Sequence, residues 1–140
     1  MNREAIYAAL FALVSVAPGL MTASRKGKPL SQIEDAEMPA LFQIQGGETW
    51  EQKKGVPSKV TLKADLEVYV SNRADPDSCP ASVLNPILDY LQAALEPSAG
   101  DTQTLGGLVS HCWIAGALEV FEGLLENKTV ALIPINILVP

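Results

Sequence analysis

The clearest pattern in the chain is an alternation of apolar and polar residues over Lys59–Asn72. Side chains on a strand point to opposite faces in turn, so the alternation predicts a strand with one apolar face and one solvent-exposed face. The apolar positions are Val60, Leu62, Ala64, Leu66, Val68 and Val70. Such a strand needs neighbours for its backbone hydrogen bonds and a cover for its apolar side. We therefore expect the rest of the chain to supply both.

A first helix is predicted over Arg3–Ala17, where apolar residues recur at three- and four-residue spacing. Asn2 is placed to cap its first turn, and Pro18 ends the pattern. Glu4 offsets the charge of Arg3 and the cleavage-site pattern is poor, so we interpret this segment as a helix of the folded domain rather than a signal peptide. Apolar residues lie around most of this helix, so we expect most of its surface to be covered. Either the sheet and a second chain cover it together, or the helix is deeply buried.

A second helix is predicted over Ala81–Leu95, which carries another apolar stripe. Pro86 lies inside this segment and predicts either a kink or a late helix start near Asn85. Turn-forming residues bound the helix, in Arg73–Pro80 before it and Pro97–Gly100 after it.

Three further segments are interpreted as strands, namely Met38–Gln45, Leu108–Val120 and Val130–Val139. Pro134 removes a backbone donor from the last of them, so that strand is expected at a sheet edge or with a bulge.

The pattern also assigns faces within Leu108–Val120. Leu118 and Val120 are expected on the core face with Cys112. His111 and Trp113 fall on the other face, and we interpret His111 as a partly buried polar residue rather than a ligand or a base.

The predicted order of elements, α–β–β–α–β–β, favours an α+β fold. We expect an antiparallel or mixed sheet of four to five strands with two helices packed on one face, in a two-layer sandwich. A chain of 140 residues suits one domain, here residues 1–140.

Two polar segments are candidates for contact with a partner. Leu20–Met38 holds a basic cluster and then an acidic one, and is read either as a solvated loop or as a partner contact. Gly46–Ser58 is predicted to protrude as a mobile loop, in which Trp50 either anchors an interface or folds back onto its own domain. The candidate protein-interface residues are Arg25, Lys26, Lys28, Trp50, Lys53 and Lys54.

Composition argues against several functional classes. The net charge of −6 disfavours nucleic-acid binding as the main role, because phosphate contacts need clustered lysine and arginine. Cys79 and Cys112 are far apart and the chain has one histidine, so a zinc site is not expected, and we predict two free thiols in a reducing compartment. We expect no membrane span, no cofactor and no catalytic residues, because no nucleophile, phosphate-binding or paired-carboxylate motif is present. An enzyme is therefore not expected.

Several local features resemble the tail terminator proteins of bacteriophages with long, non-contractile tails. They are packing and turn features rather than chemical signatures, and they are spread over most of the chain. They comprise the apolar helix Arg3–Ala17, Met38-Pro39-Ala40-Leu41, Glu67-Val68-Tyr69-Val70, Leu84-Asn85-Pro86-Ile87-Leu88-Asp89, Leu105-Gly106-Gly107 and Ala131-Leu132-Ile133-Pro134-Ile135.

The resemblance implies a structural virion protein at the head-proximal end of the tail, assembled in the host cytoplasm. Members of the family form a six-membered ring on the tail tube, stop its polymerisation and offer a surface to the connector of the capsid. The implied partners are further copies of the chain, the tail tube protein and the connector protein, with DNA only passing through the channel. An acidic chain suits such a channel, since like charge disfavours phosphate contacts.

Two other classes of function remain open at this point. One is a different head–tail joining or minor tail protein of related fold, which would differ in whether it binds tube ends or the capsid portal. The other is a small binding module or enzyme, which would need a filled pocket or turnover.

Overall fold

A computed structural model of the chain describes residues 1–71, 79–96, 102–124 and 127–140. Most of the two turn-rich segments predicted around the second helix lies outside these described residues. The helices and strands are α1 (Arg3–Val14), β1 (Thr22–Ser24), β2 (Ala40–Glu51), β3 (Lys59–Ser71), α2 (Pro80–Leu95), β4 (His111–Ile114), β5 (Glu119–Leu124) and β6 (Lys128–Val139), with 3₁₀ turns at Leu30–Gln32 and Asp35–Glu37.

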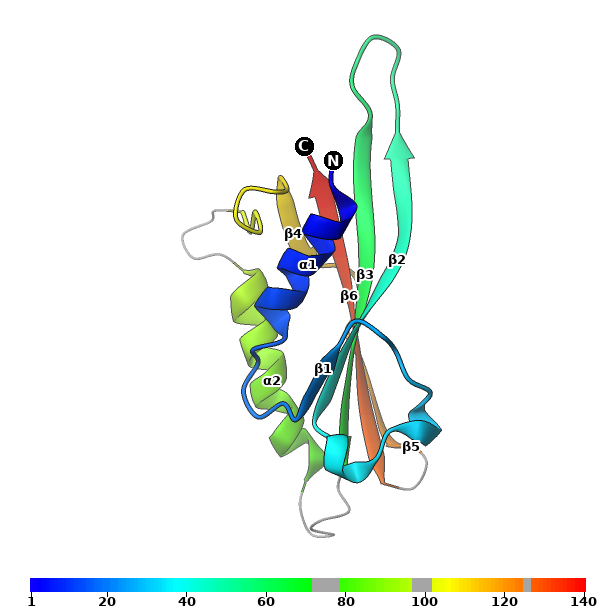
Figure 1. Cartoon of the computed structure of the whole chain (residues 1–140), viewed down its shortest axis with the longest axis vertical. Coiled ribbons are helices and arrows are strands. Elements are labelled where there is room, and N and C mark those ends of the chain that lie inside the picture. Colours follow the sequence, from blue (N-terminus) through cyan, green and yellow to red (C-terminus); the bar gives the residue numbers. More distant parts are fainter. Residues whose placement is uncertain (72–78, 97–101, 125–126) are drawn as a thin grey trace.

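The α+β class is confirmed, with two helices against an open, mixed sheet (Figure 1). The sheet has six strands rather than four to five. One extra strand is β1, which pairs in parallel with the start of β2. The other arises because the single strand predicted over Leu108–Val120 is divided between Ile114 and Glu119, where Gly116 has a φ of 75°.

The strand order is β1-β2-β3-β6-β4, and β5 pairs with β6 beyond the end of β4. All pairs except β1–β2 are antiparallel. The organising strand predicted from the alternation is therefore β3, and it lies between β2 and β6 in the middle of the sheet.

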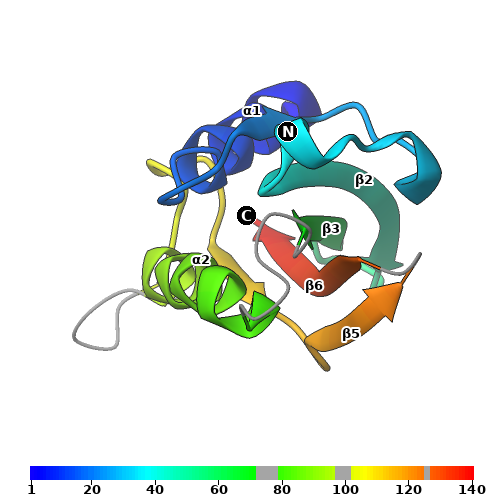
Figure 2. The same ribbon diagram turned by 90° about the horizontal axis from the view of Figure 1, so that it is seen from below.

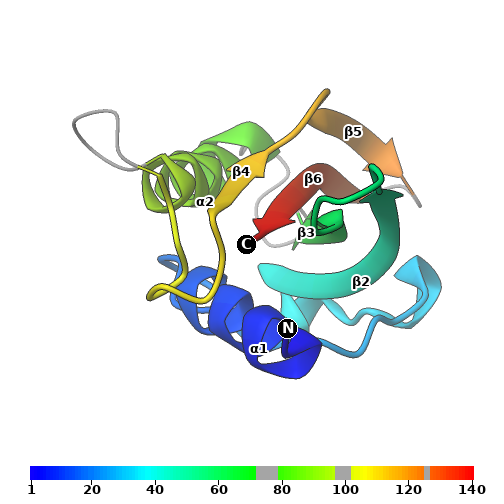
Figure 3. The same ribbon diagram turned by 90° about the horizontal axis from the view of Figure 1, so that it is seen from above.

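Both helices lie on one face of the sheet, as predicted (Figures 2 and 3). The apolar positions of β3 and β6 form the main core with Ile6, Tyr7 and Leu10 of α1 and the buried side of α2. One tyrosine hydroxyl joins α1 to the sheet, and a second joins the two helices. Tyr7 Oη donates to the carbonyl of Lys63 at 3.0 Å, and Tyr90 Oη of α2 donates to the carbonyl of Leu13 at 2.9 Å.

The opposite face of the sheet carries a second, smaller core, which the solvated-loop reading of Leu20–Met38 did not foresee. Ile33 and Met38 are buried, 1% and 6% exposed, against Phe42 of β2 and Tyr69 of β3. The segment from Leu30 to Met38 thus covers part of the sheet face that the apolar–polar alternation of β3 predicts to be solvent-exposed. A loop can supply this cover because its two 3₁₀ turns satisfy their own backbone donors.

The prediction that Pro134 places the last strand at an edge or in a bulge is wrong. β6 pairs with β3 on one side, with no register shift at Pro134, and with β4 and β5 on the other. The carbonyl of Pro134 accepts from the backbone N–H of Ala115 at 2.9 Å. A residue's carbonyl and N–H point to the same side of a strand, so the missing donor faces the break between β4 and β5. A central proline is tolerated here because its ladder partner, Asp65, lies on the β3 side, and no residue of β4 or β5 pairs with it on the other side.

The late start considered for the second helix is also wrong, because α2 begins at Pro80 and runs through Pro86. Pro80 lies in the first turn, where a missing N–H leaves no helical bond unmade.

Candidate protein-interface surfaces

The most prominent surface is the far end of the β2–β3 hairpin, which extends beyond the helices and both termini (Figure 1). The prediction of a loop over Gly46–Ser58 is wrong for its first half, because β2 continues to Glu51, which pairs with Lys59. The register shifts between Gln45 and Glu48. A Cβ on Gly46 would lie 3.2 Å from the Lys63 backbone, a tight contact, so a glycine suits this bulge where the two strands come close.

The bulge sets which way Trp50 faces. Two residues, Gly46 and Gly47, stand opposite one on β3, so Glu48 and Trp50 pair with Leu62 and Val60 on the helix-bearing face. Without the extra residue they would fall on the other face. Trp50 is thus neither in a loop nor folded into the core, and it remains 55% exposed.

Glu48 connects this part of the hairpin to the start of α1. It accepts from Arg3 through both Nε and Nη2, and from Trp50 Nε1 at 2.9 Å. These hydrogen bonds lower the pKa of Glu48 to about 2, with those from Arg3 the largest cause. The indole is therefore held by its ring nitrogen while most of its surface is open to solvent.

The tip of the hairpin presents Lys53 and Lys54 to solvent, together with Val56, which is 56% exposed. A shallow hollow at the tip is lined by Glu51, Lys53, Val56, Pro57 and Lys59. Apolar and basic groups thus lie within one short loop, a combination suited to contact with another protein.

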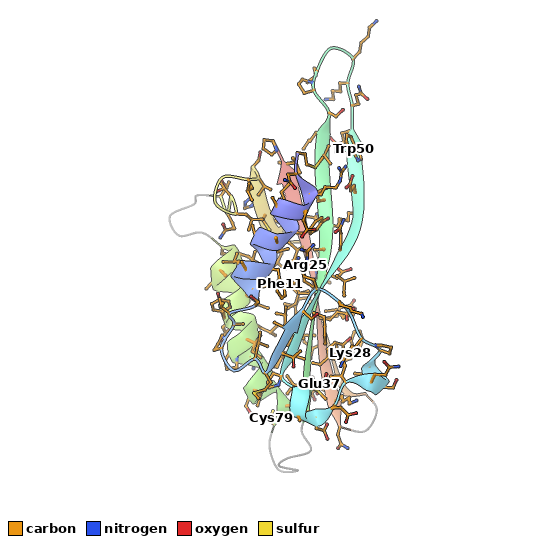
Figure 4. All side chains as sticks on the ribbon, in the orientation of Figure 1. Phe11, Arg25, Lys28, Glu37, Trp50 and Cys79 are labelled. Carbon is orange, nitrogen blue, oxygen red and sulfur yellow. The ribbon has the colours of Figure 1, made fainter. Side chains whose placement is uncertain are left out.

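The remaining predicted interface residues lie apart from the hairpin tip (Figure 4). Arg25 makes a two-pronged ion pair with Glu4 at the start of α1, which lowers the pKa of Glu4. Lys28 pairs with Glu37 at 3.0 Å. Lys26, between them, is exposed. The structure therefore joins Trp50, Lys53 and Lys54 in one surface and leaves the three basic residues after β1 in another.

A third surface was missed by sequence reasoning. Leu118 and Val120, expected to face the core, are 39% and 43% exposed, and Phe121 of β5 is 42% exposed. Val120 pairs with Ala131 and so shares the helix-bearing face with Cys112, as predicted, but its burial was predicted wrongly, because β5 pairs with the first part of β6, past the end of β4. The break at Gly116 was the one signal in the sequence for this change.

Candidate chemistry is sparse in the part of the chain that is described. His111 stacks on Trp113 with ring centroids 4.9 Å apart, and Cys112 is buried, which raises the pKa of its thiol to about 12. Cys79 and Cys112 are both free thiols. Within the described ranges, no group of three or more His, Cys, Asp or Glu side chains is placed to hold a metal. Nor does any described helix have the length and apolarity to cross a membrane.

Three surfaces thus stand out on the described part of the chain: the hairpin tip with Trp50, the basic segment after β1, and the apolar strand β5. All three suit contacts with proteins, because each carries exposed apolar or charged side chains. A scan against models of protein families and a search of curated proteins found no match to this chain.

Proposed function

We propose that this chain is a structural virion protein that caps a bacteriophage tail tube as a ring, stops tube polymerisation and provides the surface that joins the tail to the capsid connector. The resemblance to tail terminator proteins supports the proposal and suggests a ring of six. The partners are further copies of this chain, the tail tube protein and the connector protein. The protein acts at the head-proximal end of the tail and is assembled in the host cytoplasm.

The observation that carries the proposal is the hairpin that extends beyond the rest of the domain. Its bulge turns Trp50 toward the side of α1, and its tip holds Lys53, Lys54 and Val56 in the open. A capping subunit needs contacts with its ring neighbours and separate contacts above or below the ring. A body that packs beside its neighbours and a projecting arm that reaches along the ring axis would supply both.

The charge of the chain fits the same role. A ring around a channel must let DNA pass without holding it, and a net charge of −6 disfavours phosphate contacts.

The proposal is tested by the particles that form when this protein is missing. Infected cells lacking it are expected to accumulate overlong tail tubes and DNA-filled capsids without tails, measured by electron microscopy of lysates. Resupplying the protein from a plasmid serves as the control and should restore tails of normal length. Tubes of normal length in its absence would rule out termination and favour a joining or minor tail protein.

The role of the hairpin is tested separately by Trp50→Ala and by the double change Lys53→Glu and Lys54→Glu. Both variants should fold but lose tube capping, because a buried tryptophan at an interface typically contributes about 2 kcal/mol or more, roughly 30-fold in affinity. Capping is measured as the restoration of tail length in cells that lack the native protein.

Val16→Ala and Lys63→Glu are matched controls, because both side chains are exposed but lie away from the hairpin tip. Trp50→Phe separates the apolar ring from the hydrogen bond to Glu48. If the hairpin variants restore tail length as well as the controls do, the hairpin is not the capping arm.

A further inference from the structure

β1 forms one edge of the sheet, and β4 and β5 together form the other. Among the described residues, β1 pairs only with β2, and β5 pairs only with β6. The rows of paired residues connect the two edges directly. One row is Ala23–Leu41–Val68–Ala131–Val120, and its neighbours are Thr22–Ala40–Tyr69–Val130–Phe121 and Ser24–Phe42–Glu67–Leu132–Glu119. Every residue of β1 is thus level with a residue of β5.

The two edges are chemically complementary. The β5 edge carries exposed Glu119 and Glu122 beside its exposed apolar side chains. The β1 edge is preceded by Met21, which is 68% exposed, and followed by Arg25 and Lys26. Because Arg25 is paired with Glu4 of α1, the exposed Lys26 supplies the charge that attracts the acidic β5 edge, whereas two β5 edges would repel each other.

Backbone groups are also available on β5. The carbonyls of Pro134 and Leu138 accept from Ala115 and Ser110, so the even-numbered residues of β6 point toward β4 and β5. Phe121 stands opposite Val130 and therefore bonds to β6, while the N–H and C=O of Val120 point to the free edge. An exposed apolar edge of this kind is a template for another strand.

We infer that β5 of one copy of this chain pairs antiparallel with β1 of the next copy, so that the sheet continues from subunit to subunit. The antiparallel direction of this contact follows from the topology of one subunit. Strand β1 is parallel to β2 and β6 and antiparallel to β3 and β5, so a neighbouring copy in the same orientation brings its β1 antiparallel to β5. The contact joins two different patches and is therefore head-to-tail. Because β1 and β5 lie in the same rows of paired residues, each added copy is displaced little along the strand direction. A small displacement favours a closed ring over an open helical filament. The inference rests on the proposed function, since it names the contact through which the capping ring closes.

Cross-linking of the purified protein tests the contact. Ala23→Cys and Val120→Cys are combined in a Cys79→Ser background and treated with a short bis-maleimide at high protein concentration. Both new thiols lie on the helix-bearing face, and Cys112 is buried and stays unreactive. The double-cysteine protein should give a ladder of covalent oligomers that ends at one closed species.

The single-cysteine proteins are the matched controls, because a head-to-tail contact brings each new thiol against a different residue. They should remain monomeric. Cross-linked dimers from either single variant, or no ladder from the double variant, would overturn the inference.

Charge reversal gives an independent readout. One variant carries Glu119→Lys with Glu122→Lys, and the other carries Lys26→Glu, each added to the double-cysteine protein. Each alone should form the ladder less well, and a mixture of the two should recover it, since opposite charges then meet at the mixed contacts. A mixture that forms no more ladder than its components would overturn the pairing of these edges.

Val120→Pro tests the backbone pairing itself. It is made in the native sequence without the new cysteines. It removes the outward N–H without breaking a bond to β6, and should weaken self-association measured by analytical ultracentrifugation about tenfold, while Val120→Thr should not. These results stand apart from the proposed function. A ladder without tube capping would overturn termination alone, and capping without a ladder would overturn the edge contact alone.

Discussion

Replacing Leu66 with aspartate is expected to abolish soluble folding of this chain. Leu66 is fully buried at the centre of β3, in the main core beneath the helices, with Gln43 and Ile133 as its cross-strand neighbours. An unpaired carboxylate there costs several kcal/mol, a large part of the 5–15 kcal/mol by which domains are typically stable. The measurement is the soluble fraction on expression and, for any protein recovered, the thermal unfolding midpoint.

Thr61→Asp is the matched control, because Thr61 lies on the same strand, points to the opposite face and is partly exposed. It should change the free energy of unfolding by about 1 kcal/mol or less. Equal damage from both substitutions would mean that the two faces of β3 are equally buried, contrary to the structure.

Replacing Ile33 with alanine is expected to lower the free energy of unfolding by about 2–5 kcal/mol. Ile33 is 1% exposed and packs in the second core, so truncation leaves a cavity against the outer face of the sheet. The loss is measured by chemical denaturation of the isolated subunit.

Gln32→Ala is the control, since Gln32 precedes Ile33 and is exposed. It should leave the unfolding free energy almost unchanged. An Ile33→Ala protein as stable as the control would show that the segment from Leu30 to Met38 is the solvated loop that its polar sequence suggests.

The parts of the fold that could be predicted are those governed by local periodicity. The alternation of β3 predicted its buried face because a central strand with helices on one side has the same environment along its length. The two helices and their shared face followed for the same reason. Asn2 caps α1 as its position suggested, with its side chain accepting from the N–H of Ala5 at 3.0 Å.

The errors occur where distant pairing overrides local signals. Two glycines suggested that β2 ends, but they form a bulge, since the partner strand β3 continues past them. Pro134 suggested an edge strand, but a break between two distant segments accommodates it. Leu118 and Val120 were predicted to be core residues, but β5 pairs with β6 past the end of β4, and both side chains stay exposed.

The candidate surface was predicted only in part for the same reason. Exposure of Trp50, Lys53 and Lys54 follows from a polar segment, so it could be expected. The hydrogen bonds of Glu48 to Arg3 and Trp50 could not, because they depend on the bulge that brings Glu48 to the side of α1.

The position of β6 has a consequence for synthesis of the protein. Three strands that precede it in the chain, β3, β4 and β5, all pair with it. Until Lys128–Val139 has left the ribosome, β3 has one bare edge, and neither β4 nor β5 has a described strand to join. Most of the sheet therefore forms through long-range contacts after translation has passed this strand, which makes folding slower than for a domain built from local hairpins. A nascent chain cannot present a paired β5 edge to another subunit before that moment, so association through this edge has to follow synthesis of β6.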